Sequence, residues 1–380
     1  MSSLRIALVY NQKKEEPTLQ SERYDSLEPQ RANGDIADTL VLRPPPRLQS
    51  SPSTDIYAEW DTFETIDAVR AALAEIHDVT LIEADTDAYE KLRLLRPDIV
   101  FNISEGLHGV SREAQMPAIF DLLQIPYSGS DPVSLAICLD KSRTKEILSY
   151  YKIATPAFWS VSKLSDLDGV QPAFPCMVKP LHEGSSKGIY NSSMVADRSE
   201  LRTQVAKILD EYSQPAIVEE YLPGREFTVA MLGNGENVNV LPIVEIKFDS
   251  LPAGVNPIYS YEAKWIWDRS DAPLEIFECP AHLTDGLRSE IETVCRHAYR
   301  VLRCRDWSRI DVRLDAAGKP HIIEVNPLPG ILPNPEDNSC FPKAARAAGL
   351  SYQQLMQAVA GLAAQRFGLT EPALSPSHSS

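Results

Sequence analysis

The first third of the chain alternates short apolar runs with segments whose apolar residues recur at helical spacing. Thr62 stands directly before one such segment and is a suitable N-cap residue. The expected order is strand 4–10, helix 62–75, strand 79–83, helix 85–95, strand 98–103 and helix 111–123. Strands that alternate with helices usually pair in parallel, so an α/β domain is predicted to extend to about residue 128.

After residue 174 the pattern changes to short strands with one helix among them, which is typical of α+β structure. Strands are expected at 176–179, 188–194, 216–221, 226–232 and 238–248, with helices at 197–212, 283–302, 342–350 and 352–367. A chain of 380 residues is too long for one core. We therefore expect three domains, with a central domain over 129–221 and a C-terminal domain over 222–368.

Two segments lack any such periodicity. Residues 12–53 are rich in Pro, Ser, Gln, Glu and Arg, and residues 369–380 are rich in Ser and Pro. Segments of this composition bury too little apolar surface to fold alone. Both are predicted to be disordered, although a long insert of this kind can also serve as a functional lid.

The segment 307–330 contains two alternating apolar and polar stretches, separated by turn-forming residues at 316–319. A β-hairpin is expected here, with Asp315 paired to Pro320. That register places two pairs of polar residues across the strands on one face, Asp311 with Glu324 and Arg309 with Asn326.

Two carboxylates directly across a strand pair repel each other by up to about 1 kcal/mol. A divalent cation would remove that repulsion, and carboxylate and amide oxygens are suitable ligands for Mg²⁺. Asp311, Glu324 and Asn326 are therefore candidate metal ligands. The alternative is an ordinary solvated face of the hairpin on which charges alternate.

Composition and charge argue against several classes of function. A formal net charge of −16 without a Lys/Arg run argues against nucleic acid as a partner. No apolar run is long enough to span a membrane, and residues 3–10 are too short for a signal peptide, so a cytoplasmic protein is expected. The six cysteines are scattered, which favours neither zinc nor a disulfide framework.

A Gly/Ser loop at 183–188 lies between two expected strands and offers N–H and hydroxyl groups that can cover a phosphate. It matches neither a P-loop nor a dinucleotide-binding fingerprint. Residues 184–188 do match G-x-S-x-G, so a serine hydrolase with Ser186 as nucleophile is a second hypothesis. That motif requires a helix directly after it, whereas the sequence predicts a strand.

Several motifs occur in an order that resembles the D-alanine:D-alanine ligases of the ATP-grasp superfamily, over about residues 97–365. They are Asp140-Lys141, Met177-Val178-Lys179-Pro180, Glu183-Gly184-Ser185-Ser186, Val218-Glu219-Glu220-Tyr221-Leu222, Gly224-Arg225-Glu226-Phe227-Thr228-Val229, Tyr261-Glu262-Ala263-Lys264, Arg309-Ile310-Asp311-Val312 and Glu324-Val325-Asn326. The resemblance implies a three-domain ATP-grasp architecture, α/β and α+β, whose N-terminal domain is preATP-grasp-like. It also implies a homodimer formed through that domain.

The resemblance further implies an ATP-dependent ligase that joins small-molecule carboxylate and amine substrates through an acyl phosphate. Two Mg²⁺ ions, with Mn²⁺ as a substitute, would be held by the three candidate metal ligands. Arg309 would stabilise the oxyanion, with Ser186 and Lys264 also in the reaction centre. The implied ATP contacts are Lys141, Lys179 and Lys264 to phosphates, Glu219, Glu220, Tyr221 and Leu222 to adenine, Glu226 to ribose, and Glu183, Ser185 and Ser186 from the covering loop.

This chain departs from the family on the substrate side. Glu105 stands where those ligases have His, Trp265 stands where they have Tyr, and no ammonium-binding Glu follows the first strand. Gly330 and Ser339 match positions that bind the second substrate, with a longer loop between them. D-alanine with D-alanine is therefore expected to be a poor substrate pair. A true D-alanine:D-alanine ligase of cell-wall synthesis and a nucleotide-binding protein without ligase activity are the remaining alternatives.

Overall fold

A computed structural model describes residues 3–13, 57–249, 251–252, 254–267, 274 and 276–369, apart from the side chains of Trp265 and Trp267. Residues 14–53 of the expected disordered insert and residues 370–380 of the expected tail lie outside this range. The chain on either side of the insert meets again, because Gln12 forms a parallel bridge with Asp61.

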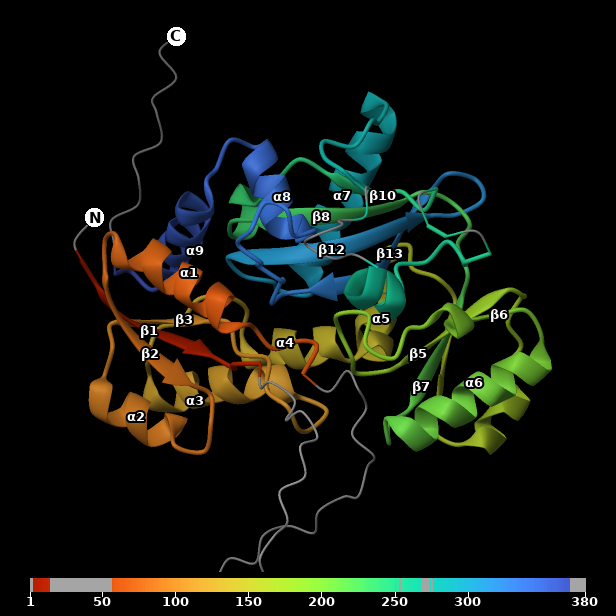
Figure 1. The fold of residues 1–380 in the computed structure, drawn as a ribbon, viewed down its shortest axis with the longest axis horizontal. Helices are drawn as coiled ribbons and strands as arrows, with labels where there is room; N and C mark the ends of the chain where they lie inside the picture. Colours follow the sequence, from red (N-terminus) through yellow and green to blue (C-terminus); the bar gives the residue numbers. More distant parts are fainter. Residues whose placement is uncertain are drawn as a thin grey trace, which may run out of the picture.

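An N-terminal sheet of three parallel strands confirms the predicted α/β pattern (Figure 1). The strand order is β2 (Asp78–Glu83), β1 (Arg5–Tyr10) and β3 (Ile99–Asn102). The accompanying helices are α1 (Phe63–Ala74), α2 (Ala88–Leu95) and α3 (Gln115–Leu123), the last preceded by a 3₁₀ turn at Arg112–Ala114. Thr62 caps α1 as expected, since its side chain accepts a hydrogen bond from the Thr65 N–H.

A central antiparallel sheet follows, in the order β4 (Phe158–Val161), β7 (Ala216–Glu220), β5 (Cys176–Pro180) and β6 (Met194–Val195). Helix α6 (Arg198–Glu211) is capped by Asp197 and covers this sheet. The predicted strand at 188–194 was wrong. Of that segment only Met194 lies in a strand, as the first residue of β6, which pairs with β5. Before β6 lies a 3₁₀ turn at Asn191–Ser193, in which the Ser193 hydroxyl accepts from the Tyr190 N–H.

The C-terminal sheet has the order β11 (Phe277–Glu278), β10 (Val244–Ile246), β8 (Glu226–Leu232), β12 (Trp307–Leu314) and β13 (Pro320–Asn326), with β9 (Asn239–Val240) paired to β8. The strand expected at 238–248 is thus two shorter strands. Remaining helices are α4 (Pro132–Leu139), α5 (Lys141–Tyr150), α7 (Asp285–Val301), α8 (Cys340–Ala347) and α9 (Tyr352–Arg366), with a π-helical segment at Glu262–Trp267.

The hairpin of β12 and β13 has the predicted cross-strand pairs but not the predicted starting pair. Leu314, rather than Asp315, lies opposite Pro320. A β-bulge next to Asp311 then adds one residue to β13 and restores the pairs Asp311–Glu324 and Arg309–Asn326. The two polar pairs consequently face the same side.

The N-terminal and C-terminal parts share one hydrophobic core. Leu8 of β1 and Ile66 of α1 belong to the same buried cluster as Leu232 of β8 and Leu355 of α9. Helices α4 and α5 contribute Cys138 and Leu148 to a second cluster beneath the C-terminal sheet. The domain boundaries at about 128 and 221 stay a prediction.

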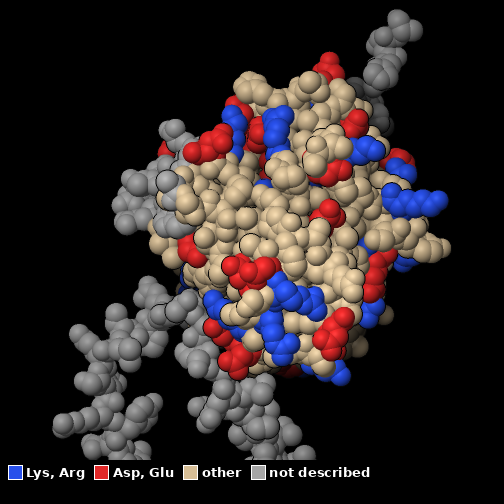
Figure 2. Space-filling model, turned by 90° about the vertical axis from the view of Figure 1, so that its right-hand side faces the viewer, with Lys and Arg blue, Asp and Glu red and all other residues tan. Residues whose placement is uncertain are grey.

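Figure 2 shows one face of the molecule, on which Lys and Arg lie beside Asp and Glu rather than in separate patches. No helix among the described residues is long and apolar enough to cross a membrane.

A buried ion pair fastens α9 to the segments that border the N-terminal and C-terminal sheets. The fully buried Asp306 accepts hydrogen bonds from the Gly129 N–H at 2.8 Å, from Asn234 at 2.8 Å and from the Arg366 guanidinium at 2.8 Å. Arg366 also donates to the Tyr127 carbonyl at 2.8 Å. Removing one charge from such a pair leaves the other uncompensated.

Asp306→Asn is therefore expected to lower the free energy of unfolding by roughly 3–5 kcal/mol, because Arg366 loses its partner in a buried setting. Urea denaturation followed by circular dichroism measures this. The control is Glu146→Gln, which breaks the exposed Arg143–Glu146 pair and should change stability little. Equal stability of the two variants would contradict the role given to Asp306.

Candidate active site

A cavity lies between the central and C-terminal sheets and brings most of the predicted site residues together. Two lysines come from α5 and β5, acidic residues come from β7 and β8, and the hairpin closes the far wall. Its lining includes Lys141, Lys179, Glu183, Ser185, Ser186, Glu219, Glu220, Tyr221, Leu222, Glu226, Lys264, Arg309, Asp311, Glu324, Gly330 and Ser339. Segments far apart in the sequence thus converge as the motif order predicts.

Two lysines at the cavity's base are held by one carboxylate. Glu219 lies 3.1 Å from the Lys145 ammonium and 2.8 Å from the Lys179 ammonium. Burial alone would raise the pKa of Glu219, but the two ammonium groups outweigh it and lower the pKa to about 2. Lys145 is itself buried and donates to Thr155 at 3.1 Å, so it positions Glu219, while Lys179 reaches the cavity.

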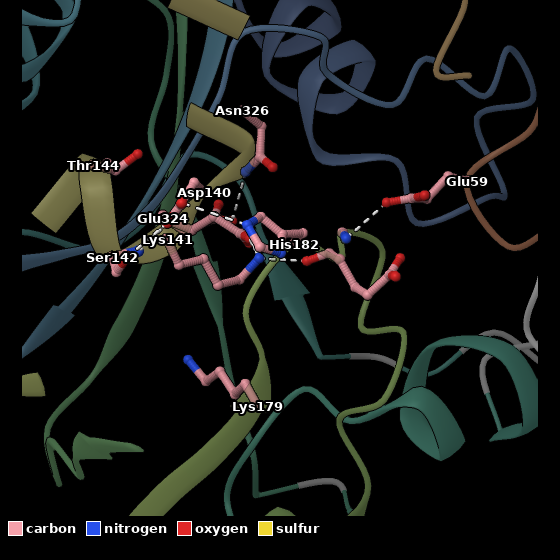
Figure 3. Close-up of polar contacts among 12 residues, drawn as sticks. Glu59, Asp140, Lys141, Ser142, Thr144, Lys179, His182, Glu324 and Asn326 are labelled. Atoms are coloured by element: carbon pink, nitrogen blue, oxygen red, sulfur yellow. Dashed lines mark hydrogen bonds and ion pairs between the residues drawn. The ribbon is translucent and has the colours of Figure 1, made fainter. Parts of the chain in front are cut away.

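A third lysine joins the hairpin to the Gly/Ser loop. The Lys141 ammonium lies 2.8 Å from the Glu324 carboxylate and donates to the Glu183 carbonyl (Figure 3). Asp140, the N-cap of α5, accepts from the Ser142 and Arg143 N–H groups and fixes the start of this helix. Lys141 is therefore placed by the helix cap and by two acceptors, one on the hairpin and one on the Gly/Ser loop.

The candidate metal ligands carry compensating partners in this structure. Asp311 accepts from Arg309 Nε at 3.1 Å and from its Nη2 at 3.0 Å, and Asn326 donates to Asp311 at 3.3 Å. Glu324 stands opposite Asp311. Among the described residues no group of three or more His, Cys, Asp or Glu could hold a metal ion. Two carboxylates and an amide oxygen fit a hard divalent cation that takes its other ligands from water or phosphate.

The far end of the cavity is apolar on one side and charged on the other. Leu222, Ile246 and Ile258 contribute apolar surface of the kind that a planar ring requires. Arg313 lies 2.7 Å from the Glu226 carboxylate and donates to the Tyr221 hydroxyl at 2.9 Å. Burial raises the pKa of Glu226 against the opposing effect of Arg313.

The Gly/Ser loop is fastened from both sides. Ser185 and Ser186 both have positive φ, 51° and 60°, a conformation that costs energy for residues other than glycine. The Ser186 hydroxyl donates to the Tyr259 carbonyl at 2.9 Å, and the Gly184 N–H donates to Glu59 at 2.7 Å.

No α-helix follows Ser186, because the chain continues into the 3₁₀ turn and β6. Its hydroxyl bonds to a carbonyl rather than to a base. The geometry that a serine nucleophile needs is thus not formed around Ser186.

Lys264 and Arg309 both line the cavity, and their charges act on each other. Burial, reinforced by the charge of Arg309, lowers the pKa of Lys264 to about 8. Lys264 lies in the π-helical segment together with Trp265, whose side chain is outside the described part of the chain. The Ser339 hydroxyl, also in the lining of the cavity, donates to the Gly330 carbonyl at 3.1 Å.

A second cavity adjoins the first at Lys141, Lys264 and Arg309 and extends towards the N-terminal sheet. Glu105 lines this second cavity, as does Asn326. Its remaining acidic lining is Glu59, Asp61, Glu113, Glu183 and Glu324.

Arg112 organises part of this wall. Its guanidinium lies 2.7 Å from the Glu59 carboxylate and 3.3 Å from the Glu183 carboxylate, and it donates to the His182 carbonyl at 2.6 Å. Lys187 lies 3.0 Å from Glu183. The negative charges of Glu59 and Glu183 are therefore compensated by nearby cations.

Sequence reasoning missed Lys145, Arg112, Asp61 and Glu113. Lys145 stands one helical turn after Lys141, and that spacing was the only available signal for it. Arg112 and Glu113 fall at the start of the expected helix 111–123, and Asp61 directly precedes the expected helix 62–75, where charged residues are ordinary. Only the packing of the N-terminal sheet against the loop distinguishes them.

Three comparisons with known proteins show what the chain is similar to. The family model described as D-ala D-ala ligase C-terminus matches residues 150–360. A D-alanine--D-alanine ligase of Bordetella petrii is 33% identical over 297 residues, which are 78% of this chain and 85% of that protein. An uncharacterised protein of Sinorhizobium fredii, y4sG, is 33% identical over 317 residues, which are 81% of this chain and 90% of that protein.

A solved structure has the same fold. The D-alanine--D-alanine ligase of Bacillus anthracis, complexed with ATP, superposes with a TM-score of 0.67 at 21% identity. The match covers 97% of this chain and 99% of that one. The predicted fold class is thereby confirmed.

Glu219 is expected to make the free energy of unfolding depend on pH in the acidic range. Its pKa is about 2 in the folded protein and 4.5 ordinarily, so its stabilising contribution is complete above pH 4.5 and is lost as the pH falls towards 2. Glu219→Gln should be less stable than the unmodified protein by about 3 kcal/mol near neutral pH.

The difference should shrink steadily below pH 4.5, since protonation then removes the same charge from the unmodified protein. Urea denaturation of both proteins from about pH 7 to about pH 3 measures it. A difference that does not change with pH would show that the two ammonium groups do not control this carboxylate.

Proposed function

The chain belongs to the D-alanine--D-alanine ligase family of ATP-grasp enzymes, and we propose how its own residues carry out the ATP-dependent amide-bond formation of that family. The protein is a ligase that forms carbon–nitrogen bonds. The observation that carries the residue assignment is the convergence of three lysines, one arginine and the facing carboxylates of the hairpin in a single cavity.

ATP would lie with its adenine against Leu222, Ile246 and Ile258 and its phosphates towards the hairpin. Lys179 and Lys141 stand along that direction, and both are already held by carboxylates. Ammonium groups held in place neutralise phosphate charge without first having to be ordered. Ser185 and Ser186 support a loop that covers the phosphates and limits access of water.

Asp311, Glu324 and Asn326 would hold Mg²⁺, as two ions, with Mn²⁺ as a substitute. Magnesium bound there supplies positive charge to the transferring phosphoryl group. Glu324 and Asp311 are at present paired with Lys141 and Arg309, so those cations would turn towards the nucleotide and the substrate as the ions enter.

The first step joins a substrate carboxylate to the γ-phosphoryl group. A carboxylate oxygen forms a bond to phosphorus, the bond to ADP breaks, and an acyl phosphate results. Lys264 and Arg309 flank this centre and counter the charge of the incoming carboxylate and the transferring group.

The second step joins the acyl carbon to an amine. The amine, having lost a proton from its ammonium form, attacks the acyl carbon, and the tetrahedral intermediate carries an oxyanion. Arg309 would donate to that oxygen. The bond from carbon to the phosphate oxygen then breaks, and phosphate leaves with the proton that the nitrogen loses as the amide forms. Ser339 and Gly330, which line the same cavity, would position the amine-bearing substrate.

Glu324→Gln keeps the shape of the side chain and removes its charge. We expect ATP turnover to fall roughly 100-fold or more, because a metal ligand and the partner of Lys141 are lost together. Turnover is measured by phosphate release, and Mg²⁺-dependent binding of a non-hydrolysable ATP analogue is measured by calorimetry.

The control is Glu292→Gln on α7, a half-exposed carboxylate outside both cavities. It should match the unmodified enzyme in both measurements. Normal turnover and normal Mg²⁺ dependence in Glu324→Gln would show that the hairpin carboxylates are a solvated face.

A homodimer is also proposed, through the N-terminal domain. Leu94 of α2 and Leu122 of α3 are 69% and 72% exposed on neighbouring helices, which supports an apolar contact there. Light scattering should give twice the chain mass, and Leu122→Asp should give a monomer. A monomer mass for the unmodified protein at micromolar concentration would refute this assembly.

A further inference from the structure

Three carboxyl groups of the second cavity form no direct ion pair or hydrogen bond among the described residues, although the charge of Arg112 acts on two of them from a greater distance. They belong to Asp61, Glu105 and Glu113, and they come from three different segments of the N-terminal part. We call the space between them the acidic pocket. It opens directly onto Lys264 and Arg309, and hence onto the reaction centre.

The neighbouring cations are already committed. Arg112 is bound to Glu59 and Glu183, Lys187 to Glu183, and Lys141 to Glu324. The charges of Arg112 and Lys141 do not outweigh burial at Glu105 and Glu113, so the carboxyl groups of the acidic pocket are held towards their neutral form when no cationic ligand is present.

The three carboxyl groups also act on one another. Burial and the charges of Glu113, Glu59 and Asp61 raise the pKa of Glu105 well above its ordinary value. Burial likewise raises the pKa of Asp61 to about 7. Charging these groups in the empty pocket is unfavourable, and a positively charged ligand would relieve that cost.

A single metal ion does not explain the arrangement. The described residues contain no cluster of His, Cys, Asp or Glu close enough to hold one. Carboxylates that are spread along the walls of a cavity instead fit an organic cation whose charges are spread along its length. An α-ammonium group alone needs about one carboxylate partner, which leaves the others without one.

We propose that the amino-acid substrate whose carboxylate is activated carries a second cationic group, so that it is a diamino acid or a similar basic amino acid. Its carboxylate lies at Arg309 and Lys264, and its two positive groups lie among Asp61, Glu105 and Glu113. This rests on the proposed function and specifies the substrate class of the same site.

The discriminating experiment is phosphate release with ATP and Mg²⁺ over a panel of single amino acids and pairs. The panel holds both enantiomers of alanine, 2,3-diaminopropionate, ornithine, lysine, arginine and glutamate. Basic amino acids are expected to exceed alanine in kcat/KM by about tenfold or more, as for one additional charged hydrogen bond in a buried site. Glutamate is expected to be inactive.

Glu113→Gln and Glu105→Gln keep side-chain size and remove one charge each. Each should lower kcat/KM for basic amino acids about tenfold. At least one of the two variants should change the value for alanine less than about threefold, because the α-ammonium group that alanine shares has only one carboxylate partner. Binding of an ATP analogue should be unchanged, because Glu105 and Glu113 line only the second cavity. Glu64→Gln on the exposed face of α1 is the matched control.

The outcomes distinguish a failure of the proposed substrate class from a failure of the proposed ligase function. Efficient reaction of alanine with no preference for basic amino acids overturns the substrate class and leaves the ligase function intact. Equal losses for basic and neutral amino acids in Glu113→Gln and Glu105→Gln would show a merely structural role and also overturn it. No phosphate release with any amino acid, although the ATP analogue binds, would overturn the proposed function and the substrate class together.

Discussion

The pairing of β12 with β13 is the constraint on which the reaction centre depends. Side chains alternate along a strand, so a slip of one residue moves every side chain to the other face. Continuing the register from Leu314 and Pro320 without interruption would place Asp311 opposite Ile323. The bulge takes up that residue and brings Glu324 opposite Asp311. One extra residue in β13 therefore decides whether two carboxylates face the cavity together.

Facing carboxylates and converging ammonium groups stabilise one another across the cavity. Lys141 of α5 reaches Glu324 of the hairpin, and Lys179 of the central sheet reaches Glu219. Each charge would be costly to bury alone, but each is met by its opposite from another segment. The same partners can be exchanged for phosphate when a nucleotide enters, because the lysines already point into the cavity (Figure 3). Structure and binding thus rest on the same set of charges.

The sequence predicted what depends on local chemistry. Thr62 marks the start of α1 because an N-cap needs only a side-chain oxygen in the right place. The predicted cross-strand pairs of the hairpin were right although the predicted starting pair was wrong, because alternating residues give no clear signal of a bulge. The strand expected at 188–194 failed because its polar residues bond locally, as Ser193 does with Tyr190. Lys145 and Arg112 gain their roles only from partners far away in the chain, and no periodicity reports such contacts.

One carboxyl group of the acidic pocket, that of Asp61, lies beside the long insert. Glu59 and Asp61 come directly after the long insert, whose ends are joined by the bridge between Gln12 and Asp61. Lengthening a loop whose ends are already fixed costs little, since each doubling adds only about 0.6 kcal/mol. New acidic residues could therefore be brought to the reaction centre without disturbing the hairpin or the lysines. Because the phosphate-side residues match the family and the residues facing the amino acid do not, the charge of the amino-acid pocket can change independently of the chemistry beside it.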